Sequence, residues 1–303
     1  MSHSSGVAVF SDGVVQATGG DYLPFGGHTR VEGCVSVREF RSTWRRAWTA
    51  ELCWVDANGR PNGIAVTPLL RSGTPCVALP YCHLGLAREI ATAGRVGVAV
   101  TDRRSLGGAT GALVAYGTVV LTEDRSGRVF LDELLDQELT KYPPSRVLAD
   151  SALDRRENWW WTPRLLLELT GTDEVLEQPP RSAPAEHALL LRAEPAGVRI
   201  RNVALHGARS ERVSCTALDG AEVPCFDTGT LFGHDYTAPD FERWESWRLF
   251  GDCRPEGFVV RSREGDPDRR LTPLGLLERL RRGRRIARAC RDGLERAERG
   301  GVK

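Results

Sequence analysis

The chain has 303 residues, a formal net charge of +1, 41% hydrophobic residues and 27% charged residues, which is the composition of a soluble globular protein of about two domains. The balanced charge disfavours a nucleic-acid-binding protein, because binding a phosphate backbone needs an excess of cations. No segment reaches the roughly 20 apolar residues that cross a bilayer, and the N-terminus carries no basic, apolar signal, so we expect no membrane span and a cytoplasmic location.

The sequence predicts a flexible leader followed by a small barrel made mostly of strands. Residues 1–34, rich in Gly and Ser, are expected to form a flexible leader, and the hydrophobic pattern after them changes between the periods of strands and helices. A barrel domain is therefore expected over 35–177. Its predicted elements are a helix at 35–47, strands at 48–54, 64–70, 75–80, 96–100, 112–122 and 164–170, and helices at 84–92 and 130–139.

The strand at 48–54 has the clearest alternation in the chain. Leu52 and Trp54 fall on one face, whereas Thr49, Glu51 and Cys53 fall on the other. A period of two is typical of a half-buried strand, with one face toward a core. We therefore expect this strand to form one wall of the barrel.

A Pro-rich linker at 178–184 leads to a second region at 185–266, for which we predict an α+β extension. Strands are expected at 187–193, 197–206 and 212–218, followed by a helix and a last strand at 258–260. The helix is predicted because aromatic residues recur every three positions, at Phe241, Trp244, Trp247 and Phe250. The predicted fold class of the whole chain is mainly β with helices (α+β), and we detect no internal repeat.

Residues 267–303 predict a basic C-terminal helix, dense in arginine, that is broken or kinked at Gly283. Leu276, Leu277, Leu280 and Ile286 are expected to lay this helix on the body of the protein. An acidic partner or an anionic surface is the alternative use of its charges.

Cysteine spacing and catalytic signatures exclude several classes of protein. The eight cysteines include no pair at two-residue spacing and no histidine at zinc-finger spacing, so we predict reduced thiols and no metal site. The chain contains no G-x-x-x-x-G-K, no G-x-S-x-G and no H-E-x-x-H, which excludes P-loop enzymes, serine hydrolases of the nucleophile-elbow type and zincins.

Short motifs in the barrel region occur in an order found in one family. They are a turn with Asp56, Gly59 and Pro61, the pair Thr67-Pro68, Arg88 in a helix, and Arg95-Val96 before a strand. In this order they resemble the flavin-binding split-barrel family that includes pyridoxamine 5'-phosphate oxidase, over about residues 41–175. The resemblance implies an FMN-binding split β-barrel, a homodimer and a flavin ring at the dimer interface.

The same resemblance implies where the cofactor phosphate would lie. Arg88, Thr67 with Pro68, and the amides that follow Tyr81, Cys82 and His83 are the residues that it assigns to cofactor binding, because a phosphate needs fixed cations and oriented N–H groups. The chain departs from the family pattern at two positions. Leu86 stands where the family has a lysine, and Glu89 stands where it has an asparagine, so a deazaflavin, a different cofactor or no cofactor are alternatives to FMN.

A second group of residues flanks a run of three tryptophans. Three consecutive tryptophans, from Trp159 to Trp161, cannot all face one core, so at least one is expected to stack on a planar ring, to line a dimer interface or to close the barrel end. Lys141, Trp160 and Arg164 therefore join the predicted cofactor-binding residues.

Two histidines lie at positions suited to chemistry. His83 follows a predicted strand at the cofactor position, and His234 precedes Asp235 and Tyr236 in the second region. We predict His234 and Tyr236 as catalytic residues, and either histidine as the axial ligand if the cofactor is haem. A structural role is the alternative for both histidines.

These observations lead to one main hypothesis and two alternatives. The main hypothesis is an FMN- or deazaflavin-dependent oxidoreductase that acts on a small molecule as a homodimer. The first alternative is a haem-binding split-barrel enzyme that degrades haem or forms nitrogen–nitrogen bonds. The second is a non-enzymatic cofactor-binding or sensor protein, which Leu86, Glu89 and the arginine-rich tail favour.

Overall fold

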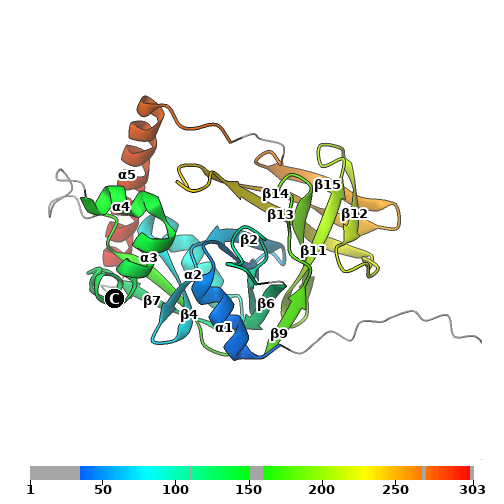
Figure 1. Cartoon of the computed structure of the whole chain (residues 1–303), viewed down its shortest axis with the longest axis horizontal. Helices are drawn as coiled ribbons and strands as arrows, with labels where there is room; N and C mark the ends of the chain where they lie inside the picture. Colours follow the sequence, from blue (N-terminus) through cyan, green and yellow to red (C-terminus); the bar gives the residue numbers. More distant parts are fainter. Residues whose placement is uncertain (1–34, 110, 151–159, 268–270, 301–303) are drawn as a thin grey trace, which may run out of the picture. The chain divides into compact units, whose positions relative to one another are not determined.

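The computed structural model describes residues 35–109, 111–150, 160–267 and 271–300 (Figure 1). The predicted leader and Trp159 lie outside this part of the chain. The fold is α+β and mainly antiparallel β, as predicted. The helices are α1 (Val37–Arg46), η1 (Tyr81–His83), α2 (Leu84–Thr92), η2 (Phe130–Leu134), α3 (Leu135–Lys141), α4 (Pro143–Asp150) and α5 (Leu276–Gly300).

The strands form two successive β structures. Those of the first are β1 (Ala50–Val55), β2 (Pro61–Val66), β3 (Leu69–Arg71), β4 (Thr74–Pro80), β5 (Val96–Val100), β6 (Ala112–Gly117), β7 (Val119–Asp124), β8 (Arg164–Leu169) and β9 (Glu174–Gln178). Those of the second are β10 (His187–Glu194), β11 (Gly197–His206), β12 (Arg212–Ala217), β13 (Phe226–Tyr236), β14 (Trp244–Arg254) and β15 (Gly257–Glu264).

The first structure is a barrel split into two sheets. One sheet has the order β2-β1-β5-β6-β9 and the other the order β3-β4-β8-β7. The chain passes between them four times, and two of these passages are short: across Thr67-Pro68 from β2 to β3 and across Thr118 from β6 to β7. Proline has no N–H to donate to a sheet, which accounts for the first break. The strand pairings therefore trace one ring, in which β2 with β3 and β6 with β7 each act as a single bent strand.

The second structure is a closed barrel with the order β10-β11-β12-β15-β14-β13. Numbered along the chain, its strands run 1-2-3-6-5-4 around the ring, and the bent strands of the first barrel follow the same order. The topology is thus repeated although the sequence shows no repeat. Hydrophobic patterning, not residue identity, specifies such a ring, so the second copy needs no similar sequence.

The helix predicted around Phe241–Phe250 is wrong, because this segment forms strand β14. β14 pairs with β13 on one side and β15 on the other, and Trp247 and Leu249 point into the barrel core. Hydrogen bonds to two neighbouring strands and burial at alternate positions outweigh the three-residue spacing of the aromatic residues. The region expected to be α+β is, between residues 185 and 266, a β-barrel.

Both faces of β1 are buried, in contrast to the half-buried strand expected. Leu52 and Trp54 lie in the core of the first barrel, as predicted. Cys53, on the opposite face, packs with Leu191 and Phe232 of the second barrel in an apolar joint. A sequence pattern indicates only how polar a face is. Because Glu51 is charged, the pattern predicted that this face would be exposed.

Two further elements differ from the prediction. β9 continues the first barrel beyond the expected last strand and pairs with β6, so ordered structure extends to the start of the predicted linker. α5 runs through Gly283 without interruption. It packs on the first barrel through Leu294 and Ala297, whereas Leu277 and Leu280 are exposed.

Candidate functional site

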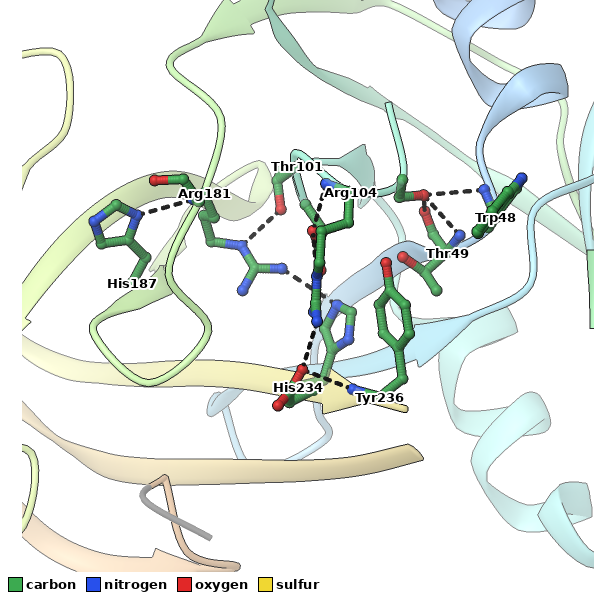
Figure 2. Close-up of polar contacts among 12 residues, drawn as sticks. Trp48, Thr49, Thr101, Arg104, Arg181, His187, His234 and Tyr236 are labelled. Atoms are coloured by element: carbon green, nitrogen blue, oxygen red, sulfur yellow. Dashed lines mark hydrogen bonds and ion pairs between the residues drawn. The ribbon is translucent and has the colours of Figure 1, made fainter. Parts of the chain in front are cut away.

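A polar cluster lies buried where the two barrels meet (Figure 2). Glu51 of β1 and His234 of β13 are fully buried, and Arg181, between the barrels, is 3% exposed. Glu51 Oε1 accepts hydrogen bonds from Arg181 Nη2 at 2.6 Å and Thr101 Oγ1 at 3.0 Å, and His234 Nε2 lies 2.8 Å away. Arg181 Nε in turn donates to Thr101 Oγ1 at 2.8 Å. The cluster thus joins Glu51 and Thr101 of the first barrel and His234 of the second to a cation in the connecting segment.

The neighbours of His234 determine its tautomer. Trp244 Nε1 donates a hydrogen bond to His234 Nδ1 at 3.2 Å, so the proton of the neutral ring lies on Nε2 and is donated to Glu51. Both ring nitrogens are therefore engaged. In this arrangement His234 has no nitrogen left for a haem iron, whereas His83 is exposed and makes no hydrogen bond among the described residues.

Two carboxylates of the cluster are held in the ionised form. Burial would raise the pKa of Glu51, but Arg181 and the hydrogen bond from His234 outweigh it and hold that pKa below its ordinary value. Burial likewise opposes ionisation of Asp102, and Arg104, at 2.7 Å, lowers its pKa. The centre is a compensated ion network rather than a carboxyl group poised to exchange protons near neutral pH.

Tyr236, predicted as catalytic, lies beside this network. Its ring is stacked under the Arg104 guanidinium, whose Cζ is 4.2 Å from the ring centroid, and its hydroxyl is directed toward Thr49 (Figure 2). The hydroxyls of Tyr236 and Thr49 and Oε2 of Glu51 have no hydrogen-bond partner among the described residues. The structure thus brings the predicted His234 and Tyr236 together, and both are buried in the joint.

Glu51 and Arg181 were missed as site residues. Glu51 carried one signal, a charge on a strand that is otherwise apolar. Arg181 lies in a predicted linker and gives no local signal, because 130 residues separate it from Glu51. Only the packing of the second barrel brings the two together.

A second polar site lies at the start of β8. Arg164 is 3% exposed, and its Nη2 donates to Glu138 Oε1 of α3 at 3.0 Å. Ser145 donates to the same oxygen at 2.6 Å. The remaining donors of Arg164, at Nε and Nη1, have no partner among the described residues, and neither has Trp161 Nε1. The site therefore offers buried N–H groups to which the described part of the chain supplies no acceptor.

Aromatic rings surround these donors. The Arg164 Cζ lies 4.0 Å from the centroid of the Phe130 ring and 5.7 Å from that of Trp161. Trp160, one of the predicted cofactor residues, is half-buried beside this cluster. An acceptor bound here would meet one fixed cation and flat apolar walls.

Lys141 is buried at the end of α3. Its Nζ donates to the backbone carbonyls of Pro68 at 2.5 Å and Trp44 at 3.2 Å, and burial lowers the pKa of Lys141 to about 7. The amine ties α3 to α1 and to the bend between β2 and β3. Pro68 is buried in this bend, and Thr67 beside it is half-buried.

The remaining predicted cofactor residues lie around η1 and α2. Tyr81 is buried in the barrel core, and Cys82 lies at α5, near Cys290. The backbone of α5 at Gly293 packs directly on the Tyr81 carbonyl and the Cys82 amide. Arg88 is 47% exposed and pairs with Glu123 at 2.6 Å. These residues do not converge on one cradle, because α5 covers the amides on which the phosphate was expected.

The two departures from the family pattern have structural explanations. Glu89 Oε1 accepts a hydrogen bond from the Trp54 indole at 2.7 Å. Leu86 packs against the core of the first barrel. Both side chains therefore serve the barrel itself.

A separate pocket of about 270 Å³ opens on the second barrel. Asp235, Glu245, Trp247, Pro267 and Leu271 are among its lining residues. None of the predicted cofactor-binding residues lines it. Its acidic wall does not suit a phosphate group.

No family model and no curated protein matches the chain. Among solved structures, the chain is similar to the haem storage protein HutZ from Vibrio cholerae, at 14% identity and a TM-score of 0.33 over 48% of this chain and 96% of that one. It is similar to a protein of the pyridoxinephosphate oxidase family from Clostridium acetobutylicum, at 15% identity and a TM-score of 0.30 over 44% and 82% of the two chains. It is also similar to an F420 reductase, at 15% identity and a TM-score of 0.32 over 45% of this chain and 94% of that one. At these TM-scores the likenesses decide neither the cofactor nor the reaction.

Proposed function

We propose that this chain is a split-barrel oxidoreductase that binds a flavin-type cofactor, FMN or a deazaflavin, and acts on a small molecule. The observation that carries the proposal is a set of buried donors, Arg164 Nε and Nη1 and Trp161 Nε1, that have no acceptor within the described ranges of the chain. Buried donors are rarely left unpaired in proteins, so an acceptor-rich ligand is the natural partner. A flavin has such acceptors in its phosphate and its ring carbonyls, and the donor set fits it.

Several residues of this site would have defined tasks. Arg164 would bind an anionic or carbonyl oxygen, and Glu138, itself held by Ser145, would fix the guanidinium in place. Trp160 would offer a flat face for stacking. The bound flavin would supply hydride or electron transfer, and the aromatic walls around Arg164 would exclude water.

The absorption spectrum of the purified protein tests the proposal. We expect flavin or deazaflavin bands in the protein as isolated, or quenching of the fluorescence of added FMN or F420 on binding. A protein that is colourless and binds neither compound would overturn the proposal and favour the non-enzymatic alternative.

A pair of variants locates the cofactor. Arg164→Gln removes the cation and is expected to weaken flavin binding by about 10- to 100-fold, the range for a charge-assisted hydrogen bond. Arg71→Gln is the matched control, because Arg71 lies on the same sheet and has its carboxylate partners in Glu133 and Glu168. Circular dichroism checks that both variants fold. Equal affinities of the two variants would place the cofactor elsewhere.

Haem is the second candidate cofactor, and the exposed imidazole of His83 favours it. Titration with haem would then give a Soret band that His83→Ala shifts or abolishes. His234→Gln would leave the band in place, because both nitrogens of His234 are engaged within the barrel joint.

A further inference from the structure

The central part of α5 concentrates positive charge. Residues 279–291 contain seven arginines and no acidic residue, in a chain whose formal net charge is only +1. Among the described residues, Arg279 pairs with Glu242. By contrast, Arg281, Arg284, Arg285 and Arg288 make no ion pair or hydrogen bond within the part of the chain that the structure describes.

These arginines face away from the protein. The helix packs on the first barrel through Cys290, Gly293 and Ala297, which are buried. At 100° per residue, Arg281, Arg284 and Arg288 fall on the opposite side of the helix. All three are exposed.

The same outward stripe begins with two exposed leucines. Leu277 is 69% exposed and Leu280 is 51% exposed, which makes them two of the five large hydrophobic residues exposed on the described part of the chain. A helix contributes no stability to a protein by leaving leucines in water, and no described residue covers this turn. Apolar side chains followed by unpaired arginines form the surface that we call the α5 stripe (Leu277, Leu280, Arg281, Arg284 and Arg288).

We propose that the α5 stripe docks on an anionic lipid surface. The arginines would bind the headgroup phosphates, and the two leucines would enter the boundary between headgroups and acyl chains. This mode is peripheral, since no helix in the described ranges is long and apolar enough to cross a membrane.

The two leucines favour a lipid surface over a nucleic acid or an acidic protein tail. A phosphate backbone or a carboxylate-rich tail would engage the arginines and leave Leu277 and Leu280 in water. The stripe also carries no aromatic side chain on which a base could stack. A bilayer offers charge and an apolar layer together.

Vesicle co-sedimentation of the full chain tests the proposal. We expect binding to vesicles that contain phosphatidylserine together with phosphatidylcholine, and weak binding to phosphatidylcholine alone. Binding should weaken as salt rises, because exposed charges are screened. Equal binding to both vesicles, or no binding to either, would overturn the proposal.

Three variants of α5 separate the contributions. Replacement of Arg281, Arg284, Arg285 and Arg288 by Gln should weaken binding by about fivefold for each arginine removed. Leu277→Ser with Leu280→Ser should weaken the binding that survives at high salt. Arg296→Gln with Arg299→Gln is the matched control, because these arginines lie on the same helix beside Glu295 and Glu298. A loss of binding per arginine equal to that of the control, which removes two arginines instead of four, would contradict the proposal.

Two further measurements keep the result specific. Helix content and unfolding temperature, measured by circular dichroism, should match the wild type in all three variants, because the replaced side chains are exposed. Duplex DNA and polyglutamate are added as competitors. Stronger binding to either polymer than to the vesicles would replace the lipid surface with that class of partner.

Discussion

Glu51 shows how one buried charge can serve two domains. Its Oε1 meets a cation, a hydroxyl and an imidazole, each from a different part of the chain. The apolar residues around it would pack without this charge. We therefore infer that the ion network makes the packing of the two barrels specific, because only one arrangement pairs all of its charges. We infer that the role of His234 in this network is to position the joint.

Glu51→Gln is expected to destabilise the protein by about 3–5 kcal/mol, because it leaves the buried Arg181 cation without the carboxylate that its Nη2 contacts. Chemical denaturation followed by tryptophan fluorescence measures the change. Asp173→Asn is the control, since this carboxylate pairs with Arg95 but is 55% exposed and is expected to contribute less than about 1 kcal/mol. Equal losses in the two variants would contradict a buried ion network.

Lys141 is expected to make the free energy of unfolding rise with pH above neutrality. Its pKa is about 7 in the folded protein against an ordinary 10.5, so the unfolded chain holds a proton between these values that the folded protein has lost. The penalty for burying the ammonium is complete below about pH 7 and is relieved as pH rises toward 10.5, and the slope is at most about 1.4 kcal/mol per pH unit. Lys141→Met should flatten the rise in the free energy of unfolding between pH 7 and 10, and an unchanged slope would assign it to other groups.

At the scale of elements, local pattern was enough where neighbours in sequence are also neighbours in space. The predicted helix at 84–92 and strand at 96–100 coincide with α2 and β5. The predicted turn is present too, with Gly59 at φ 75° and Asp56 Oδ1 accepting from the amides of Asn58 and Arg60. The prediction for β14 was wrong because this segment is a strand through its pairing with β13 and β15, which its own residues do not indicate.

The packing of α5 on η1 depends on a missing side chain. A Cβ at Gly293 would lie 2.0 Å from the Tyr81 carbonyl oxygen, whereas a Cβ at Gly283 would meet nothing within 4 Å. Gly293→Ala should therefore push α5 away and destabilise the protein by about 1–3 kcal/mol. Gly283→Ala, on the same helix, should stabilise it by up to about 1 kcal/mol through helix propensity. Thermal unfolding and hydrogen exchange of the α5 amides check both, and a stabilising Gly293→Ala would refute this contact.

At the scale of the whole molecule, the two barrels share an apolar joint and are expected to unfold together. Phe232, which is fully buried there, packs with Cys53 and Leu191. Phe232→Ala should cost about 3–5 kcal/mol. Hydrogen exchange should show β1 and β13 losing protection at the same denaturant concentration, and separate transitions would show that the barrels are independent.

The repeated topology bears on the oligomeric state. The second barrel covers one sheet of the first, and η2 covers the other through Phe130 and Leu134. Both sheets of the first barrel are thus partly covered by described residues of the same chain, which differs from a barrel covered by a second copy, so we expect light scattering to give a mass near 33.4 kDa. A mass twice as large would restore the homodimer that the family resemblance implies.

The sequence by itself determined the order of the elements in the first barrel and the residues of its core, because alternation, turns and helix ends are properties of neighbouring residues. It also placed Arg164 among the residues worth testing. Only the tertiary structure decided that β14 is a strand, that the outer face of β1 is buried, and that Glu51, Arg181 and His234 meet. The physical reason is distance along the chain. Glu51 and Arg181 are 130 residues apart, and a local sequence pattern cannot predict a contact that forms only after both barrels have folded.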